Sequence, residues 1–328
     1  MIKKIILIFL LVILLVFLYF FLNSNENLNA YINKYSNSAT VFFSTVISTE
    51  DLLKKYTSSV EQEKVVKILI VPGHEPDLGG AIYKGLKERD LNLLLSEKVR
   101  KILGKNIKFE IIVSRDTNGW NPTLENYVNT NNAEILSWVN DKKKVMNELV
   151  ETGKISVVKS EMGHMRAPLN SAIFLYGINK WAGENKIDIV MHLHFNDNLK
   201  YKGKPTYAGF SIYVPEKQYS NSTSSKDFAN FIVPELLKIQ KVSTMPEESN
   251  GVNEDQELIS MGRYNTSNTL SVLIEYAYIY EGFMQKTKTR NAFIDKAAAS
   301  TARAINNFFE SKDQQLLVTT SKQKTEKN

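Results

Sequence analysis

Two histidines and two glutamates occupy positions from which a metal-assisted hydrolysis could be built: His74, Glu88, His194 and Glu275. His74 lies in the turn VPGHEPDLGG, His194 lies near the end of the apolar stretch IDIVMHLHF, and Glu275 lies inside the apolar stretch TLSVLIEYAYI. Two imidazoles and one carboxylate form a common zinc ligand set that leaves one position for water, and a second carboxylate can then act as a base. A carboxylate inside a buried strand also requires a compensating cation or hydrogen bonds.

Neighbouring side chains offer competing interpretations of this set. The chain has four histidines and no cysteine, so any metal would be bound by His, Asp or Glu. His192 lies two residues before His194, and because such residues share one face of a strand, this pair could itself bind a metal. His164 in EMGHMRAP is either a loop residue or a contact that a lid delivers, and Glu75 beside His74 is an alternative ligand.

The apolar pattern from Val65 onward predicts strands that alternate with helices. Strands are predicted at 65–71, 108–115, 187–195, 209–214 and 269–279, and helices at 88–104, 133–151, 224–240 and 290–309. Near-continuous apolar strands between helices are typical of an α/β sheet that is covered on both faces. Ligands of such sheets gather where the strands end, which is where the two histidines of the set lie.

A long connection interrupts this alternation. About seventy residues, roughly 117–186, separate the second predicted strand from the third, and they include the charged helix at 133–151. A connection of this length is usually a lid, a binding loop or an insertion. We interpret the three tryptophans of the chain as packing groups rather than sugar platforms: Trp120, Trp138 and Trp181.

The N-terminus carries a hydrophobic segment. Lys3 and Lys4 precede an unbroken apolar run from Ile5 to Leu22. A run of this length can cross a bilayer as a helix, and the lysines favour a cytoplasmic position for that end. We expect residues 1–22 to be a transmembrane anchor or uncleaved signal, with a cleaved signal peptide as the alternative; in each case the rest of the chain is exported.

Composition divides the rest of the chain into a spacer, a domain and a tail. Residues 23–63 are rich in polar residues and are predicted to be a spacer with one short helical piece, 64–310 the folded domain, and 311–328 a disordered tail. The apolar content of 43% is enough for a substantial core. The formal net charge of +6 is too mild and too evenly spread to indicate nucleic-acid binding.

Five stretches of the chain resemble, in the same order, motifs of the zinc-dependent N-acetylmuramoyl-L-alanine amidases, cell-wall hydrolases with a mixed six-stranded α/β fold. The stretches are VPGH, GLKERDLNLLLSEKVRKIL, VSRDT, IDIVMHLHFND and TLSVLIEYAYI, and the resemblance spans about 65–309 with a gap across the long connection. It implies a single mixed, mostly parallel sheet of about six strands, flanked by helices on both faces and carrying a helical insertion. The domain at 64–310 would then be the amidase catalytic domain, with the insertion at about 117–186.

The resemblance also implies roles for the four side chains. His74, Glu88 and His194 match the family's zinc ligands, and His194 is preferred to His192 because Asn196 completes a His-x-Asn motif. Zn²⁺ would activate water, and Glu275 would act as general base and then as general acid. The chain departs from the family pattern at three places: Val71 for an aspartate, Glu75-Pro76 for a Gly-Gly pair, and Tyr276-Ala277-Tyr278 for a glycine-aromatic pair.

The implied reaction is hydrolysis of the amide bond between N-acetylmuramic acid and L-alanine in peptidoglycan, for cell-wall remodelling or cell separation. The partners implied are peptidoglycan, the membrane through residues 1–22, and an activator protein of unknown identity. The chain would work in the cell envelope, membrane-anchored with its catalytic domain outside the cytoplasm, or alternatively as a secreted protein. Two other functions fit the same residues: a non-catalytic peptidoglycan-binding protein with this fold, and a zinc peptidase acting on the peptide stems.

Overall fold

The computed structural model describes residues 48–58, 65–160, 167–197 and 207–325, with side chains described up to Glu310. The expected N-terminal anchor at 1–22, most of the spacer at 23–63, and His164 lie outside these ranges. All described residues belong to one compact unit, 44–328. Within the described ranges, none of the helices has the length and apolar character needed to cross a bilayer.

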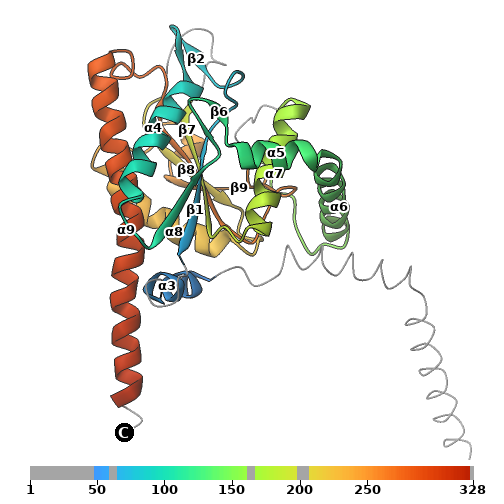
Figure 1. Cartoon of the computed structure of the whole chain (residues 1–328), viewed down its shortest axis with the longest axis vertical. Helices are drawn as coiled ribbons and strands as arrows, with labels where there is room; N and C mark the ends of the chain where they lie inside the picture. The colour runs from blue at the N-terminus through green and yellow to red at the C-terminus, as the bar shows by residue number, and fades with distance from the viewer. Residues whose placement is uncertain (1–47, 59–64, 161–166, 198–206, 326–328) are drawn as a thin grey trace, which may run out of the picture. The chain divides into compact units, whose positions relative to one another are not determined.

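A six-stranded mixed sheet forms the centre of the domain, as the sequence predicted (Figure 1). In spatial order the strands are β4 (Phe109–Val113), β1 (Val66–Pro72), β7 (Ile189–Asn196), β10 (Leu270–Tyr278), β8 (Ser211–Pro215) and β9 (Val252–Asp255). The first four are parallel, β8 is antiparallel to β10, and β9 is parallel to β8. Five strands lie where the apolar pattern placed them, whereas the pattern gave no sign of β9.

One face of the sheet is covered by helices that the periodicity predicted. These are α4 (Glu88–Leu103), α8 (Ser222–Leu237) and α9 (Thr287–Thr325), and the short α3 (Thr49–Ser58) joins the same core. Ile68 and Ile70 of β1 alternate with residues that point to the other face, and they pack against Leu91 and Leu95 of α4. The helix α9 continues past Phe309, where the pattern predicted its end, because no glycine or proline stops it before Thr325.

The second face is covered by helices from the long connection. These are α5 (Pro122–Thr130) and α7 (Leu169–Glu184), with α6 (Asn132–Glu151) packed on α7 (Figure 1). Leu69 and Val190 of the sheet pack against Leu124 of α5 and Ile178 of α7, and all four are fully buried. Much of this connection is therefore a layer of the fold, in addition to any part it has at the active site.

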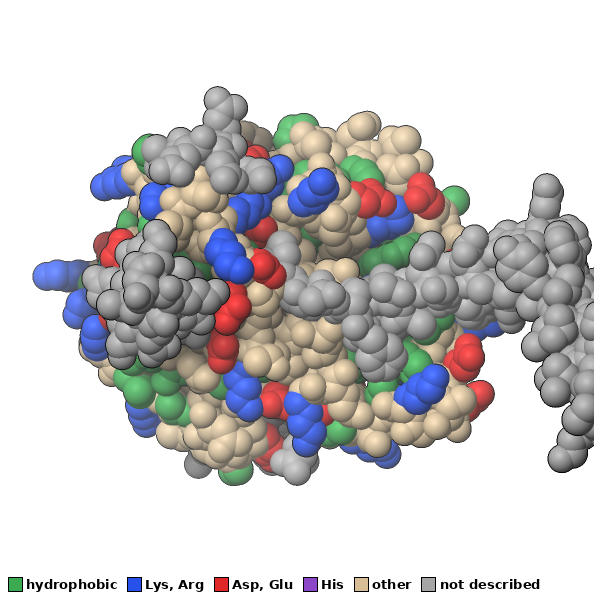
Figure 2. Space-filling view, turned by 90° about the horizontal axis from the view of Figure 1, so that it is seen from below, with side chains coloured by type: hydrophobic (Ala, Val, Ile, Leu, Met, Phe, Trp, Pro, Cys, Tyr) green, Lys and Arg blue, Asp and Glu red, His purple; other side chains and the backbone are tan. Residues whose placement is uncertain are grey.

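The N-terminal edge of the parallel strands is closed by α3. Asp188, which directly precedes β7 and is 1% exposed, accepts hydrogen bonds on Oδ2 from Lys55 Nζ at 2.5 Å and from the backbone N–H of Lys67 at 2.7 Å. Figure 2 looks at this edge and shows basic and acidic side chains interspersed, with none of the described histidines in view. The described histidines thus do not contribute to this surface.

The C-terminal edge of the same strands carries two small hairpins. One is β2 (Ile82–Tyr83) with β3 (Leu86–Lys87), and the other is β5 (Arg115–Asp116) with β6 (Gly119–Trp120). A short 3₁₀ helix, η1 (Pro246–Glu248), lies in the connection between α8 and β9. Because β1, β7 and β10 all end at this edge, side chains that are far apart in the sequence come together there.

Candidate active site

His74, Glu88 and His194 meet at the C-terminal edge of the sheet. Glu88 Oε2 lies 2.8 Å from His74 Nε2, and Glu88 Oε1 lies 3.0 Å from His194 Nδ1. One ligand atom of each residue lies within 4.8 Å of the others, and the two imidazole rings are 5.0 Å apart between centroids. The structure therefore brings together the three residues that the sequence proposed as metal ligands.

Glu88 is fixed as the first residue of α4, where the helix N-terminus favours negative charge. Its Oε2 accepts a hydrogen bond from the backbone N–H of Ala81 at 2.9 Å, and Oε1 accepts from Asn92 Nδ2 at 3.3 Å. Burial would raise the pKa of Glu88, but the charges and hydrogen bonds of His74 and His194 outweigh burial and hold this pKa well below its ordinary value. The carboxylate is thus ionised at neutral pH.

The turn after β1 presents His74 in a left-handed backbone conformation, with φ of 67°. Glycines on both sides make room for the rings. A Cβ at Gly73 would lie 2.2 Å from His194 Cε1, and a Cβ at Gly80 would lie 2.8 Å from His74 Cδ2. The glycines of VPGHEPDLGG therefore permit the close approach of the two imidazoles and of the turn.

A buried arginine, Arg115, holds this turn through hydrogen bonds to its carbonyl groups. Arg115, which is 2% exposed, donates from Nε to the carbonyl of His74 at 2.8 Å, and from Nη2 to the carbonyls of Gly73 at 2.8 Å and Arg89 at 2.9 Å. Burial lowers the pKa of Arg115 to about 10, so it remains a cation at neutral pH. Sequence reasoning noted Arg115 only as part of VSRDT; its role follows from contacts that no local pattern reveals.

Glu275 lies on β10, the strand next to β7, beside the three candidate metal ligands His74, Glu88 and His194, which we call the ligand cluster. In the register of β10 and β7 it is the direct partner of His194. Its Oε2 is buried and has no hydrogen-bond partner among the described residues. Burial raises the pKa of Glu275 well above its ordinary value, and the charges of Glu88, Glu248 and Asp197 raise it further. A carboxyl group in this state can hold a proton close to the place where a metal ion would bind.

Behind the site lies a second buried carboxylate, that of Glu248, which the sequence did not indicate. Glu248 is fully buried, and it accepts hydrogen bonds from Asn196 Nδ2 at 2.7 Å, Tyr213 Oη at 2.6 Å and Tyr278 Oη at 2.7 Å. Asn196 of the His-x-Asn motif is therefore held by Glu248. The residue lies in PEES, an unremarkable polar segment, and nothing in its sequence context signals burial.

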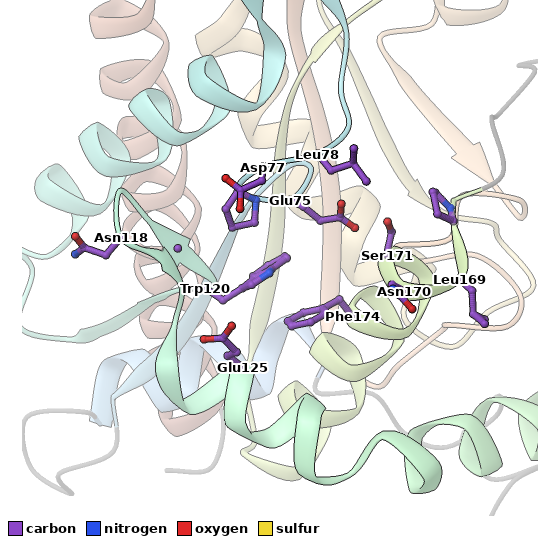
Figure 3. Close-up of a pocket in the computed structure, with 13 residues that line it drawn as sticks. Glu75, Asp77, Leu78, Asn118, Trp120, Glu125, Leu169, Asn170, Ser171 and Phe174 are labelled. Atoms are coloured by element: carbon purple, nitrogen blue, oxygen red, sulfur yellow. The ribbon is translucent and has the colours of Figure 1, made fainter.

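The competing candidates lie elsewhere. His192 is 1% exposed, its Nε2 has no hydrogen-bond partner among the described residues, and it is not part of the group that could hold a metal. Burial and the nearby His194 lower the pKa of His192 to about 3, which keeps the ring neutral. Glu75 lines a neighbouring cavity and does not join the ligand group (Figure 3).

The donor set fits a zinc ion. Two imidazole nitrogens and an ionised carboxylate converge, and the atoms that meet here as hydrogen-bond partners are those that a divalent cation would use. Zinc accepts nitrogen and oxygen ligands in this combination and leaves further positions for water and substrate. The donor set is of the kind used in metal-assisted hydrolysis, and Glu275 lies on the neighbouring strand directly opposite His194.

Comparison with protein families gives one match. The model of a family described as N-acetylmuramoyl-L-alanine amidase matches residues 68–307, which is more than two thirds of the chain. The match includes all four side chains of the site. No curated protein matches the chain.

Solved structures of similar fold include several bacterial amidases. The CwlD amidase of Clostridioides difficile, solved in complex with the GerS lipoprotein, has a TM-score of 0.49 at 15% identity, over 75% of this chain and 99% of that one. An N-acetylmuramoyl-L-alanine amidase of Clostridium difficile 630 gives 0.47 at 16% identity, over 76% and 98%. The catalytic domain of CwlV from Bacillus (Paenibacillus) polymyxa var. colistinus gives 0.46 at 15% identity, over 75% and 99%.

Proposed function

The chain belongs to the family of N-acetylmuramoyl-L-alanine amidases, and from this premise we propose how its own residues carry out the reaction. The reaction of the family is hydrolysis of the amide bond between N-acetylmuramic acid and L-alanine in peptidoglycan, and this chain is a hydrolase of that kind. One observation carries the proposal for the site: His74, Glu88 and His194 converge, and Glu275 lies directly opposite His194.

His74, Glu88 and His194 would hold a zinc ion. When bound, zinc would polarise the scissile carbonyl and lower the pKa of water towards about 7. Glu88 supports binding by being ionised and by lying between the two imidazoles, while Arg115 and the glycines of the turn hold His74 in place. These contacts orient the ligands before any metal arrives.

Glu275 would move the protons of the reaction. Its buried Oε2 is free to accept a proton from the attacking water, because no described residue occupies it with a hydrogen bond. The raised pKa of Glu275 makes its carboxylate a stronger proton acceptor, and a nearby divalent cation would lower that pKa and favour the ionised form. Glu275 would then return the proton to the nitrogen of the leaving L-alanine.

The substrate places the enzyme outside the cytoplasm. An apolar run from Ile5 to Leu22 behind two lysines supports the further proposal that residues 1–22 anchor the chain in the membrane. The catalytic domain at 64–310 would then reach peptidoglycan across the spacer at 23–63, and it would serve cell-wall remodelling or cell separation.

The identity of the product tests this function. Residues 44–328, the compact unit, are incubated with peptidoglycan with and without a chelator, and the released ends are identified by mass spectrometry. We expect stem peptides with a free L-alanine amine, no such product with the chelator or in Glu275→Gln, and normal product in the exposed control Glu148→Gln. Cleavage inside the stem would establish a peptidase instead, and binding without cleavage would establish a non-catalytic protein.

A further inference from the structure

A cavity of about 680 Å³ opens next to the ligand cluster. Three segments form its walls: the turn that follows His74, the β5–β6 hairpin with the start of α5, and the first turns of α7 (Figure 3). Glu75, the residue directly after His74, is part of the wall. A molecule that enters the cavity therefore lies beside the position at which the amide bond is cut.

An aromatic pair forms one side of this cavity. Trp120 of β6 stacks on Phe174 of α7 with ring centroids 4.3 Å apart and an angle of 16° between the planes. Trp120 is only half buried, whereas Trp181 is buried in the core of the second face. Leu169 lines the same space and is 69% exposed. The cavity thus offers apolar surface that the fold itself does not cover, and Trp120, which packs against the core of the second face as predicted, also lines this surface.

The charge of the cavity has a single sign. Glu75, Asp77 and Glu125 line it, and no Lys, Arg or His is among its lining residues. None of these three carboxylates forms an ion pair with another described residue. Figure 3 shows Glu75 and Asp77 on one side of the Trp120 ring and Glu125 on the other. Three carboxylates without cations around an aromatic ring favour a ligand that carries a positive charge.

We propose that this cavity binds the amine-bearing side chain of the third residue of the peptidoglycan stem. The inference rests on the proposed amidase function, which brings a muramoyl peptide to the neighbouring site. The third residue of the stem is a diamino acid whose side chain ends in a primary amine, which is protonated at neutral pH. Three extended residues span about 10 Å, so a stem whose first amide lies at the ligand cluster can reach a cavity whose wall begins at Glu75.

The chemistry of the two partners matches at each point. The aliphatic part of the diamino-acid side chain lies against Trp120 and Leu169, and its ammonium group faces the carboxylates and the aromatic ring. The neutral sugar rings of the glycan could also stack on Trp120, but they would leave Glu75, Asp77 and Glu125 without a positive partner. The acidic lining therefore assigns the cavity to the peptide side of the scissile bond.

Turnover of two matched substrates tests the assignment. The zinc-loaded full chain is assayed with N-acetylmuramoyl-L-Ala-D-Glu-L-Lys and with the same compound acetylated on the lysine amine. We expect acetylation to raise KM about tenfold with little change in kcat, the size of one lost charged contact at a partly exposed site. Glu125→Gln should reduce this discrimination to about a third, and the exposed control Glu148→Gln should leave it unchanged.

A binding measurement separates the two claims. Tryptophan fluorescence follows binding of the free tripeptide L-Ala-D-Glu-L-Lys and of its acetylated form to the full chain, without any need for turnover. Tighter binding of the free amine that depends on Glu125 supports the inference even if hydrolysis fails, and failed hydrolysis of both substrates overturns only the amidase function. Equal KM and equal binding for the two forms overturn the inference, as does binding of a peptide-free glycan disaccharide that is lost in Trp120→Ala.

Discussion

At the N-terminal end of β7, the buried carboxylate of Asp188 faces the ammonium group of Lys55, whereas Glu275 at the opposite edge faces other carboxylates. Asp188 Oδ2 lies 2.5 Å from Lys55 Nζ, although its Oδ1 has no partner among the described residues. Glu275 has no described cationic partner, and its acidic neighbours Glu88 and Glu248 raise its pKa. Asp188 thus has its counter-charge within the chain, whereas Glu275 has none among the described residues.

This difference separates structural charge from functional charge. Removing a charge from a pair that the chain completes by itself costs stability, because the partner is left without compensation. A cluster of like charges at a buried site destabilises the fold, and it persists where a ligand supplies the opposite charge. The contrast predicts that substitutions at the C-terminal edge act on the reaction, whereas those at the N-terminal edge act on folding alone.

The largest expected effect is that of Glu275→Gln on catalysis. The amide keeps the size of the side chain but cannot take a proton, so kcat on a muramoyl peptide should fall by about 10²–10⁴-fold. Zinc content should stay at the wild-type level, since Glu275 is not in the ligand group. A kcat within threefold of wild type would remove Glu275 from the mechanism.

The same substitution should change the pH dependence of stability in metal-free protein. The folded-state pKa of Glu275 is raised, so the folded state binds more protons than the unfolded state between the two pKa values, and stability falls as pH rises through that window. Glu275→Gln should therefore unfold at a higher temperature than wild type at neutral pH, with the difference shrinking towards pH 4. Thermal unfolding curves at a series of pH values, with chelator present, measure this.

Next in size is the loss of the buried guanidinium under the turn. Arg115→Lys cannot serve the carbonyls of Gly73, His74 and Arg89 together, so we expect a loss of about 2–3 kcal/mol in the free energy of unfolding and weaker zinc binding. Urea unfolding and competition with a zinc indicator give both quantities. The exposed Arg100→Lys on α4 is the control, and equal behaviour of the two variants would contradict the role of Arg115.

At the other edge, Asp188→Asn should affect stability alone. It removes the counter-charge of Lys55 while the amide oxygen can still accept from the N–H of Lys67, so we expect a loss of about 1–2 kcal/mol. In Asp188→Asn, the kcat and the zinc content of the folded fraction should match wild type. The control Glu110→Gln removes an exposed partner of Lys67 and should change neither the kcat nor the zinc content. A tenfold fall in kcat in Asp188→Asn would contradict the prediction that substitutions at the N-terminal edge affect folding alone.

The smallest expected effect concerns the hydrogen bonds that the buried Glu248 accepts. Tyr213→Phe removes one of three hydrogen bonds to the buried Glu248 and should cost about 1 kcal/mol in unfolding free energy. Because Glu248 also holds Asn196, a fall of a few-fold in kcat should accompany it. The same substitution at Tyr83, a residue of the β2–β3 hairpin, should leave both quantities at wild-type values.

The sequence was most informative about the four candidate site residues, which the structure brings together. His74, Glu88, His194 and Glu275 stand in recognisable surroundings, namely a glycine-rich turn, a helix start and two apolar strands. Strands buried on both faces also leave a continuous apolar signal, which predicted five strands of the sheet.

Features that depend on tertiary contacts gave no such signal. The strand β9 has only four residues, mostly polar, and α7 hides its periodicity because it buries the polar Asn179, whose amide donates to the carbonyls of Ser260 and Asn265. Glu248 and Arg115 are likewise defined by partners far away in the sequence, as is the cavity beside His74. Local pattern cannot report on such partners, since they are chosen by the fold.

The most direct test of the account is the zinc content of the purified chain, measured by mass spectrometry of the metal after exhaustive dialysis. We predict about one zinc per chain in wild type and in Glu275→Gln, and strongly reduced zinc in His74→Ala, Glu88→Gln and His194→Ala, each verified as folded by circular dichroism. Equal zinc in wild type and in the three ligand variants would contradict the proposal that His74, Glu88 and His194 bind zinc. A wild-type protein that contains no zinc and still cleaves peptidoglycan would contradict it as well.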